Sequence, residues 1–287
     1  MSVPTAVVVA SPRPRRAIRS ETTRWLLAVP AAVVVLVAIV GPALAPYDPT
    51  RVIGPPGREP FGRYALGTDS AGLDVLSRVL VATRTNLLIA LAVVLAATLV
   101  GLVLGAAIGM NESRRGPLGT LARAVNRFVD LFTAVPAVIV GLVAVAFFGG
   151  TVTVLVVVIA VVLAPIQVRL VRTEVLRVRG EAYLEAARMA GFSELRLTVR
   201  HVLPNSWGAV SENMPVIFGM AVVLTAALGF IGVGLPRPTP EWGSMISLGA
   251  SDAATGRWWA AAFPALALIV TVAAASALGT ALRARRA

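Results

Sequence analysis

The sequence lacks cysteine and lysine, has a single histidine, and is poor in charged residues of any kind. Without cysteine the chain forms no disulfide, thiolate metal site or cysteine nucleophile. His201 alone excludes an all-histidine metal site within one chain. Without lysine there is no phosphate-binding Gly-x-x-x-x-Gly-Lys loop. Little is left from which an enzyme active site could be built, so we predict no catalytic residue and no bound metal or cofactor in this chain.

Apolar residues are what the sequence has in abundance. They make up 57% of the chain, and only 14% is charged, against about 25% in soluble domains. Several apolar runs approach the ~20 residues with which a helix crosses the hydrocarbon core of a bilayer. The sequence therefore predicts an all-α, polytopic membrane protein with six transmembrane helices, at about 25–45, 87–110, 128–148, 151–167, 215–233 and 258–282.

The polar segments divide the chain further. We interpret residues 1–24 as a disordered cytoplasmic tail and residues 25–282 as the membrane domain. Residues 283–287 are interpreted as a short basic cytoplasmic tail. The first apolar run also resembles a cleavable export signal, but it is longer than the usual ~7–15 residues of such a signal, which favours an uncleaved anchor. The long polar loop at 168–208 is the most helix-prone segment outside the membrane.

The positive charge is distributed unevenly. All 26 basic residues are arginine, giving a net charge of +12. With six spans, 19 of these arginines fall on the side of the two termini and 7 on the other. The positive-inside rule then places both termini and the 168–208 loop in the cytoplasm of a bacterial cell. Membrane topology and contact with lipid account for this charge, so we expect no binding of nucleic acid.

Two features of the spans allow more than one interpretation. Gly101, Gly105 and Gly109 share one helix face, which favours close packing inside the bundle over a subunit or gate contact. The tryptophans near the outer ends of the last two spans indicate an aromatic belt at the membrane interface, with substrate stacking as the alternative; they are Trp242, Trp258 and Trp259.

Acidic residues near the spans bear on the transport class. Asp130 and Glu212 lie near predicted cytoplasmic ends, and no acidic residue is predicted in the middle of a span. Ion-driven carriers usually keep ionisable groups deep in the membrane. The pattern therefore argues against a secondary carrier, the main rival among transport proteins.

The first half of the polar loop predicts a short helix and a turn. Residues 181–189 consist largely of strong helix formers. Glu185 and Arg188 are spaced to pair across one turn, and Gly191 suits the left-handed residue that ends a helix. Ser193 can then cap a second helix.

The second helix of the loop is predicted to be amphipathic. Leu195, Val199 and Val202 are spaced to form an apolar stripe, and Pro204 is expected to end the helix. The stripe could pack on the membrane bundle or on a docked partner, or the loop could lie on the membrane surface. The pattern alone does not decide among these.

The same loop carries a resemblance to a known family, in the stretches EAARMAG (185–191) and RHVLPN (200–205). They resemble the EAA loop of ATP-binding-cassette (ABC) import permeases, in which a Glu-Ala-Ala triplet is followed by a glycine and a Leu-Pro pair. The matching residues are Glu185, Ala186, Ala187, Gly191, Leu203 and Pro204. The pair Arg200-His201 is typical of the peptide-importer branch.

Three further stretches, at 66–88, 129–140 and 228–246, resemble the C-type permease of dipeptide and oligopeptide importers. They include family-motif residues expected on the outer side, namely Gly67, Thr68, Asp69, Asp74, Trp242 and Gly243. The chain departs from the family at Leu73, where an arginine is usual between the glycine and the aspartate, and in its short basic C-terminus.

The resemblance implies the fold of a type I ABC importer permease and a mechanism of alternating access. It implies that residues 185–191 dock as a coupling helix on an ATPase, with Glu185 as a polar anchor and the alanines as the packing face. The expected partners are a homologous second permease, two ATP-binding-cassette ATPase subunits that carry ATP and Mg²⁺, and an extracytoplasmic substrate-binding protein. Peptide is the leading substrate class, with nickel, haem or glutathione as alternatives.

Overall fold

The computed structural model describes residues 21–283, and the predicted tail disorder therefore lies almost wholly outside the described residues. All regular elements in this range are helical. In chain order they are α1 (Glu21–Leu44), α2 (Val75–Asn111), α3 (Pro117–Phe132), α4 (Ala137–Phe148), α5 (Val152–Arg179), α6 (Ala182–Met189), α7 (Glu194–Leu197), the π-helical turn η1 (Thr198–Val202), α8 (Leu203–Ile231), α9 (Trp242–Ala253) and α10 (Trp259–Arg283).

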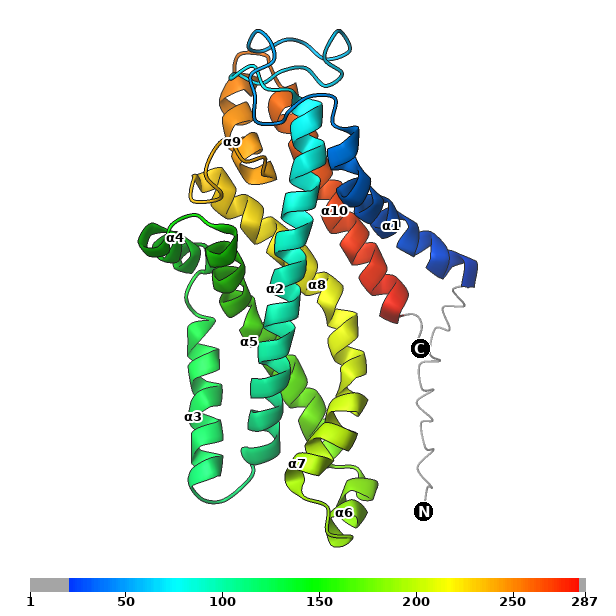
Figure 1. The fold of residues 1–287 in the computed structure, drawn as a ribbon. Coiled ribbons are helices and arrows are strands. Elements are labelled where there is room, and N and C mark those ends of the chain that lie inside the picture. Colours follow the sequence, from blue (N-terminus) through cyan, green and yellow to red (C-terminus); the bar gives the residue numbers. More distant parts are fainter. Residues whose placement is uncertain (1–20, 284–287) are drawn as a thin grey trace, which may run out of the picture.

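The three longest helices, α2, α5 and α8, form the centre of an elongated bundle (Figure 1). The loop at 45–74 and α9 lie at one end of it, and α6 and α7 lie at the other. Helices α1 and α10 flank the bundle on one side, and α3 and α4 lie on the opposite side. This arrangement puts the two sets of sequence-predicted motif residues at opposite ends of the same three helices.

The long helices extend past the predicted spans. Helix α2 begins at Val75 instead of about residue 87, and α5 continues to Arg179 instead of ending near Gln167. At ~1.5 Å per residue, the 37 residues of α2 give a rod much longer than the ~30 Å hydrocarbon core. Hydropathy marks where a helix is apolar, but backbone hydrogen bonds continue through polar side chains, so the helices extend beyond the apolar runs that predicted the spans.

The third predicted span is not one continuous helix. In the described part of the chain five helices are long and apolar enough to cross a membrane, and α3 with α4 makes a sixth only as a pair bent by 91°. Pro136 directly precedes α4. Proline lacks an N–H and disfavours helical backbone in the residue before it, here Val135. The same proline was within the predicted span and its effect was not anticipated.

The segment at 234–257, between the fifth and sixth predicted spans, contains the helix α9. Glu241 caps this helix by accepting hydrogen bonds from the backbone N–H groups of Gly243 (2.7 Å) and Ser244 (2.9 Å). A buried carboxylate at this position satisfies the free N–H groups of the first helical turn. This helix was not predicted, because the proline- and glycine-rich composition around it is typical of a loop.

Packing between α2 and α5 confirms the interpretation of the glycine face. A methyl group at Gly105 would lie 2.7 Å from both the Val168 carbonyl and the Val171 Cβ, and one at Gly109 would lie 2.7 Å from a Val175 methyl. Real side-chain carbons essentially never approach so closely. The glycines therefore let two membrane helices pack backbone to backbone within the bundle.

Candidate functional site

The Glu-Ala-Ala triplet lies on α6, at the tip of the molecule beyond the long helices (Figure 1). Glu185 and Ala186 are exposed, and Ala187 is half-buried against a small apolar core. Leu184 is fully buried in that core. One face of α6 therefore packs against the rest of the chain. The face that carries Glu185 and Ala186 is exposed and is called the open face below.

The turn after α6 has the predicted form. Gly191 adopts a φ of +84°, a left-handed conformation that only glycine adopts at little cost. The N–H of Phe192 donates to the Ala187 carbonyl (3.2 Å), which satisfies a free carbonyl at the helix end. Ser193 then caps α7 by accepting from the Arg196 N–H (3.3 Å). Both predictions from local sequence are confirmed.

The ion pairs of this loop are not the predicted ones. Arg188 pairs with Glu194, at 3.1 Å, instead of with Glu185. Glu194 also lies 3.4 Å from Arg114, in the loop between α2 and α3. At the foot of α5, Arg179 donates a 2.7 Å hydrogen bond to the Gly109 carbonyl of α2. These contacts join α6 to α7, α7 to the loop that follows α2, and α5 to α2. None of them involves Glu185.

The second helix of the loop also departs from the prediction. Its short α7 passes through the π-turn η1 into α8, so Pro204 lies in the first turn of a long helix instead of ending one. Proline is tolerated there because the first-turn N–H groups need no helical partner. The wider π-turn also separates the predicted stripe: Val202 is buried, whereas Leu195 and Val199 are 75% and 59% exposed.

The opposite end of the molecule is built around the motif Gly67, Thr68, Asp69 and Asp74. Thr68 and Asp74 form an isolated bridge, and Asp74 caps α2 by accepting from the Ser77 N–H (2.7 Å). Asp69 accepts from the Leu73 N–H (2.9 Å). Burial raises the pKa of the Asp69 carboxyl, although the Leu73 N–H and the Arg78 guanidinium act in the opposite direction. The structure therefore brings these four residues together as one folded cap.

Arg78 was missed as a site residue, although it lies in one of the stretches that resemble the family. It is 2% exposed, and its Nη1 donates to the Pro49 carbonyl (3.1 Å) and the Pro238 carbonyl (3.3 Å). Its Nε lies 3.9 Å from Asp69. One guanidinium thus connects the 45–74 loop, α2 and the segment before α9. From the sequence, Arg78 counted only as one of the arginines on the side opposite the termini. Contacts with residues so far away along the chain leave no signal in the local sequence.

Trp242 and Gly243 lie at the start of α9 and are buried. Trp242 is fully buried, so it belongs to the core and not to an aromatic belt. A methyl group on Gly243 would overlap the Ala226 carbonyl of α8. Trp259 is 5% exposed and donates from Nε1 to the Thr68 carbonyl (3.0 Å). Of the three tryptophans only Trp258, at 52% exposed, fits the predicted interface position.

A buried polar group connects the three central helices between these two ends. Gln167 of α5 is fully buried. Its Nε2 donates to Thr98 of α2 (3.0 Å), and its Oε1 accepts from Asn213 of α8 (3.0 Å). Side-chain hydrogen bonds of this kind hold helices together in an apolar surrounding. The helices that support α6 and α7 are therefore linked to one another within the bundle.

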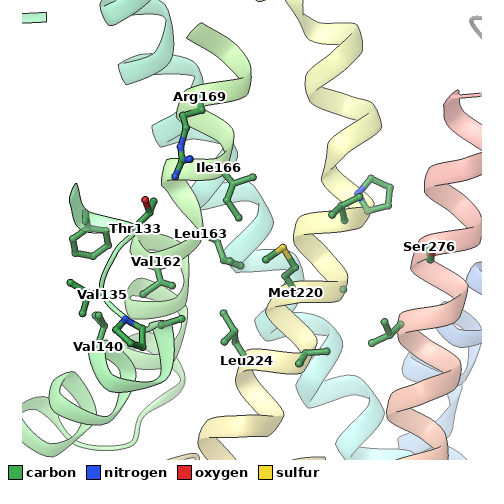
Figure 2. A pocket seen from close by; sticks show the side chains of 18 of the residues that line it. Thr133, Val135, Val140, Val162, Leu163, Ile166, Arg169, Met220, Leu224 and Ser276 are labelled. Atoms are coloured by element: carbon green, nitrogen blue, oxygen red, sulfur yellow. The ribbon is translucent and has the colours of Figure 1, made fainter. Parts of the chain in front are cut away.

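Beside these helices lies a cavity of about 630 Å³. Its walls are formed by α5, α8, α10 and the segment from Phe132 to Val140, and they are mostly apolar (Figure 2). The polar side chains on it are few: Thr133, Arg169, Ser276 and Arg283. The volume is within the ~300–1,000 Å³ of small-molecule sites, so the cavity is a candidate for part of the transport pathway.

Comparison with known families decides the class of this protein. Residues 97–287, which include the cavity helices and the α6–α7 loop, match the family described as "Binding-protein-dependent transport system inner membrane component". The chain belongs to this family. Membership agrees with the resemblance seen in the sequence and makes the protein a multi-pass membrane transport component.

Individual relatives of this family are similar over most of their length. The di/tripeptide transport system permease DppC of Pseudomonas aeruginosa is 35% identical, covering 87% of this chain and 82% of the relative. The dipeptide permease DppC of Escherichia coli K12 is 34% identical over 88% and 84%. The glutathione transport system permease GsiD of Pectobacterium atrosepticum is 34% identical over 78% and 72%.

The fold agrees with a solved structure of the same class. A chain of the MetNI methionine ABC transporter in an inward-facing conformation aligns with a TM-score of 0.53. It covers 69% of this chain and 94% of the other, at 20% sequence identity. At that identity the match shows the fold, which is that of a type I ABC importer permease.

Proposed function

We propose that this chain is the permease subunit of an ATP-driven importer for di- or oligopeptides in a bacterial cell membrane. It would form half of the translocation pathway with a homologous second permease. The observation that carries the proposal is an exposed α6 at the end of three linked helices, in a family of binding-protein-dependent transport components. Substrate, partners and orientation follow from the relatives' names and from charge, and they are part of the proposal.

The coupling role of α6 has a physical basis in its contacts. The complex would contain two ATPase subunits that hold ATP and Mg²⁺, one on each permease. The subunit on this chain would bind the open face of α6, which carries Glu185 and Ala186. Because Leu184 is buried and Glu194 is paired with Arg114 and Arg188, a movement of α6 is passed to the foot of α2. Switching of this kind requires rigid, discretely packed elements. The chain itself would carry out no chemistry and hold no cofactor.

The opposite end would receive the substrate-binding protein. The cap formed by Gly67, Thr68, Asp69 and Asp74 is held to the segment before α9 by Arg78. These residues are largely buried, so they would shape the outer surface and not contact the partner directly. We place this end outside the cell and both termini in the cytoplasm, because arginines are concentrated at the α6–α7 end.

The substrate class rests on the relatives. The names of two of them specify dipeptides or di- and tripeptides, and one specifies glutathione. Glutathione remains the alternative with an observation in its favour, since that relative is 34% identical. Binding of radiolabelled dipeptide or glutathione to the system's substrate-binding protein would separate the two.

The coupling proposal is tested by substitutions at the open face and at the turn. We expect Glu185→Lys to abolish transport by placing a positive charge on the docking face. We expect Gly191→Pro to do so because proline cannot adopt a positive φ. In both variants the ATPase subunits should no longer co-purify with the permease, while the permease remains in the membrane fraction. The measurements are peptide uptake in cells and the ATPase content of the purified complex.

The matched control is Glu59→Lys, which makes the same charge change at an exposed residue of the outer 45–74 loop. This variant should retain its ATPase subunits. Full transport together with full ATPase association in both α6-loop variants would contradict the coupling role.

A further inference from the structure

The cavity beside α5 carries its charge at one end. Along α5 its lining runs from Val162 through Leu163 and Ile166 to Arg169, the residue nearest the α6–α7 end. The Arg169 guanidinium is turned toward Thr133 on the segment between α3 and α4 (Figure 2). Arg283, the last described residue of α10, also lines the cavity. An apolar space therefore ends in arginine side chains at its predicted cytoplasmic mouth.

Arg169 is less engaged than its neighbour on the same helix. Arg172 makes two short contacts with Glu112, at 2.6 and 3.1 Å, which is a complete bidentate pair. The contact between Arg169 Nε and Asp130 Oδ1 is 3.7 Å, longer than a hydrogen bond. The side chains of Arg169 and Asp130 are 46% and 50% exposed. Arg169 thus faces the cavity with hydrogen-bonding capacity that its own chain does not use.

Asp130 has a second local partner. Its Oδ2 accepts a 3.1 Å hydrogen bond from Asn126, one turn earlier on α3. The carboxylate therefore stays held on α3 whether or not Arg169 is beside it. Another carboxylate can therefore replace Asp130 at the Arg169 guanidinium. The planar guanidinium favours bidentate pairing with a carboxylate.

We propose that Arg169 binds the free C-terminal carboxylate of the transported peptide at the cytoplasmic end of the cavity, and that Asp130 competes for the same guanidinium and so promotes release. The proposal rests on the proposed function, since it names the part of a peptide substrate that this chain recognises. Peptide side chains would contact the apolar walls, which discriminate little among them. A pathway site must bind strongly enough to admit its substrate and weakly enough to let it leave.

The two residues are expected to act in opposite directions. Loss of a charge-assisted contact costs roughly tenfold or more in affinity, so Arg169→Gln should weaken binding of alanyl-alanine by about that factor. Asp130→Asn should strengthen it, because the competitor is removed. For the C-terminal amide of alanyl-alanine, which lacks the carboxylate, neither substitution should matter. The ratio of the two affinities is therefore the decisive quantity.

Binding can be measured on the purified nucleotide-free transporter complex without its substrate-binding protein, so that only the membrane site is sampled. Saturation-transfer NMR with alanyl-alanine and its amide detects weak binding of this kind. Arg172→Gln is the matched control: it removes an arginine from the same helix that does not line the cavity, and it should leave the ratio unchanged. A folding defect would lower the affinities for alanyl-alanine and for its amide together, so their ratio would not change.

The outcomes separate this proposal from the proposed function. If the wild-type complex with its binding protein imports no peptide on addition of ATP, the proposed function is wrong. If it imports peptide and Arg169→Gln keeps the wild-type preference for alanyl-alanine over the amide, the carboxylate site is wrong and the importer stands. A weaker preference in Arg169→Gln with no gain in Asp130→Asn would overturn the release role of Asp130.

Discussion

Among single residues, Glu241 combines complete burial with an ionisable group. Burial raises the pKa of the Glu241 carboxyl, although hydrogen bonds from the Gly243 and Ser244 N–H groups act in the opposite direction. The folded protein therefore holds a proton at this position more readily than the unfolded chain does. The resulting stability is fully present below the ordinary pKa of a glutamate and is lost as the pH rises through the higher folded pKa.

We expect Glu241→Gln to remove this pH dependence. Glutamine keeps an oxygen that accepts from the helix N-terminus but carries no charge to bury. The wild-type protein should gain thermal stability relative to the variant as the pH falls from 7.5 to 5. The measurement is the midpoint of thermal unfolding of both proteins in detergent at the two pH values. The difference between the proteins cancels contributions from Asp69, whose raised pKa both share. A difference that does not vary with pH would contradict the prediction.

At the scale of secondary-structure elements, the contact between α2 and α5 depends on space left by glycine. We expect Gly105→Val to destabilise the protein by about 1–3 kcal/mol, the usual cost of forcing extra carbon atoms into a packed core. The added methyls would meet the Val168 carbonyl and the Val171 side chain. Denaturation of the purified protein measures the change. Transport should fall as well, because α2 and α5 would no longer move as one unit.

Ala107→Val is the control for this substitution. Ala107 lies on the same stretch of α2 but is exposed, so the methyl groups of valine meet no packed neighbour there and only the lower helix propensity of valine relative to alanine acts. Its stability should stay within about 0.5 kcal/mol of wild type, as for most surface changes. Equal losses for the two variants would show that a β-branched side chain in this stretch of α2, and not the contact with α5, explains the effect.

At the scale of the whole molecule, the proposed orientation in the membrane can be tested at the two ends of α2. Ser70 is exposed just before α2, and Ser113 is exposed just after it. Because the chain contains no cysteine, a single introduced thiol can be labelled without background. In right-side-out vesicles a membrane-impermeant maleimide should label Ser70→Cys. It should label Ser113→Cys only after the membrane is permeabilised.

The two variants control for each other, since both exchange an exposed serine at an end of the same helix. Labelling of both residues before permeabilisation would mean leaky vesicles. The reverse pattern would overturn the proposed orientation and place α6 outside the cell, where no ATPase could reach it.

Features that depend on neighbouring residues could be predicted from the amino-acid sequence. The apolar runs specified a helical membrane protein, because a helix in lipid must satisfy its backbone internally. Gly191 and Ser193 specified the turn between α6 and α7, because capping acts within a few residues. The family motifs indicated the class of transporter before any contact was known.

Features that depend on distant residues could be seen only once the packing of the helices was known. The burial of Trp242 arises from its packing in the core formed with other helices. The same holds for the partner of Arg188 and for the contacts of Arg78 with carbonyls as far as 160 residues away. Side-chain pairing and burial are settled by which helices come into contact, and local sequence carries no signal for contacts across such separations.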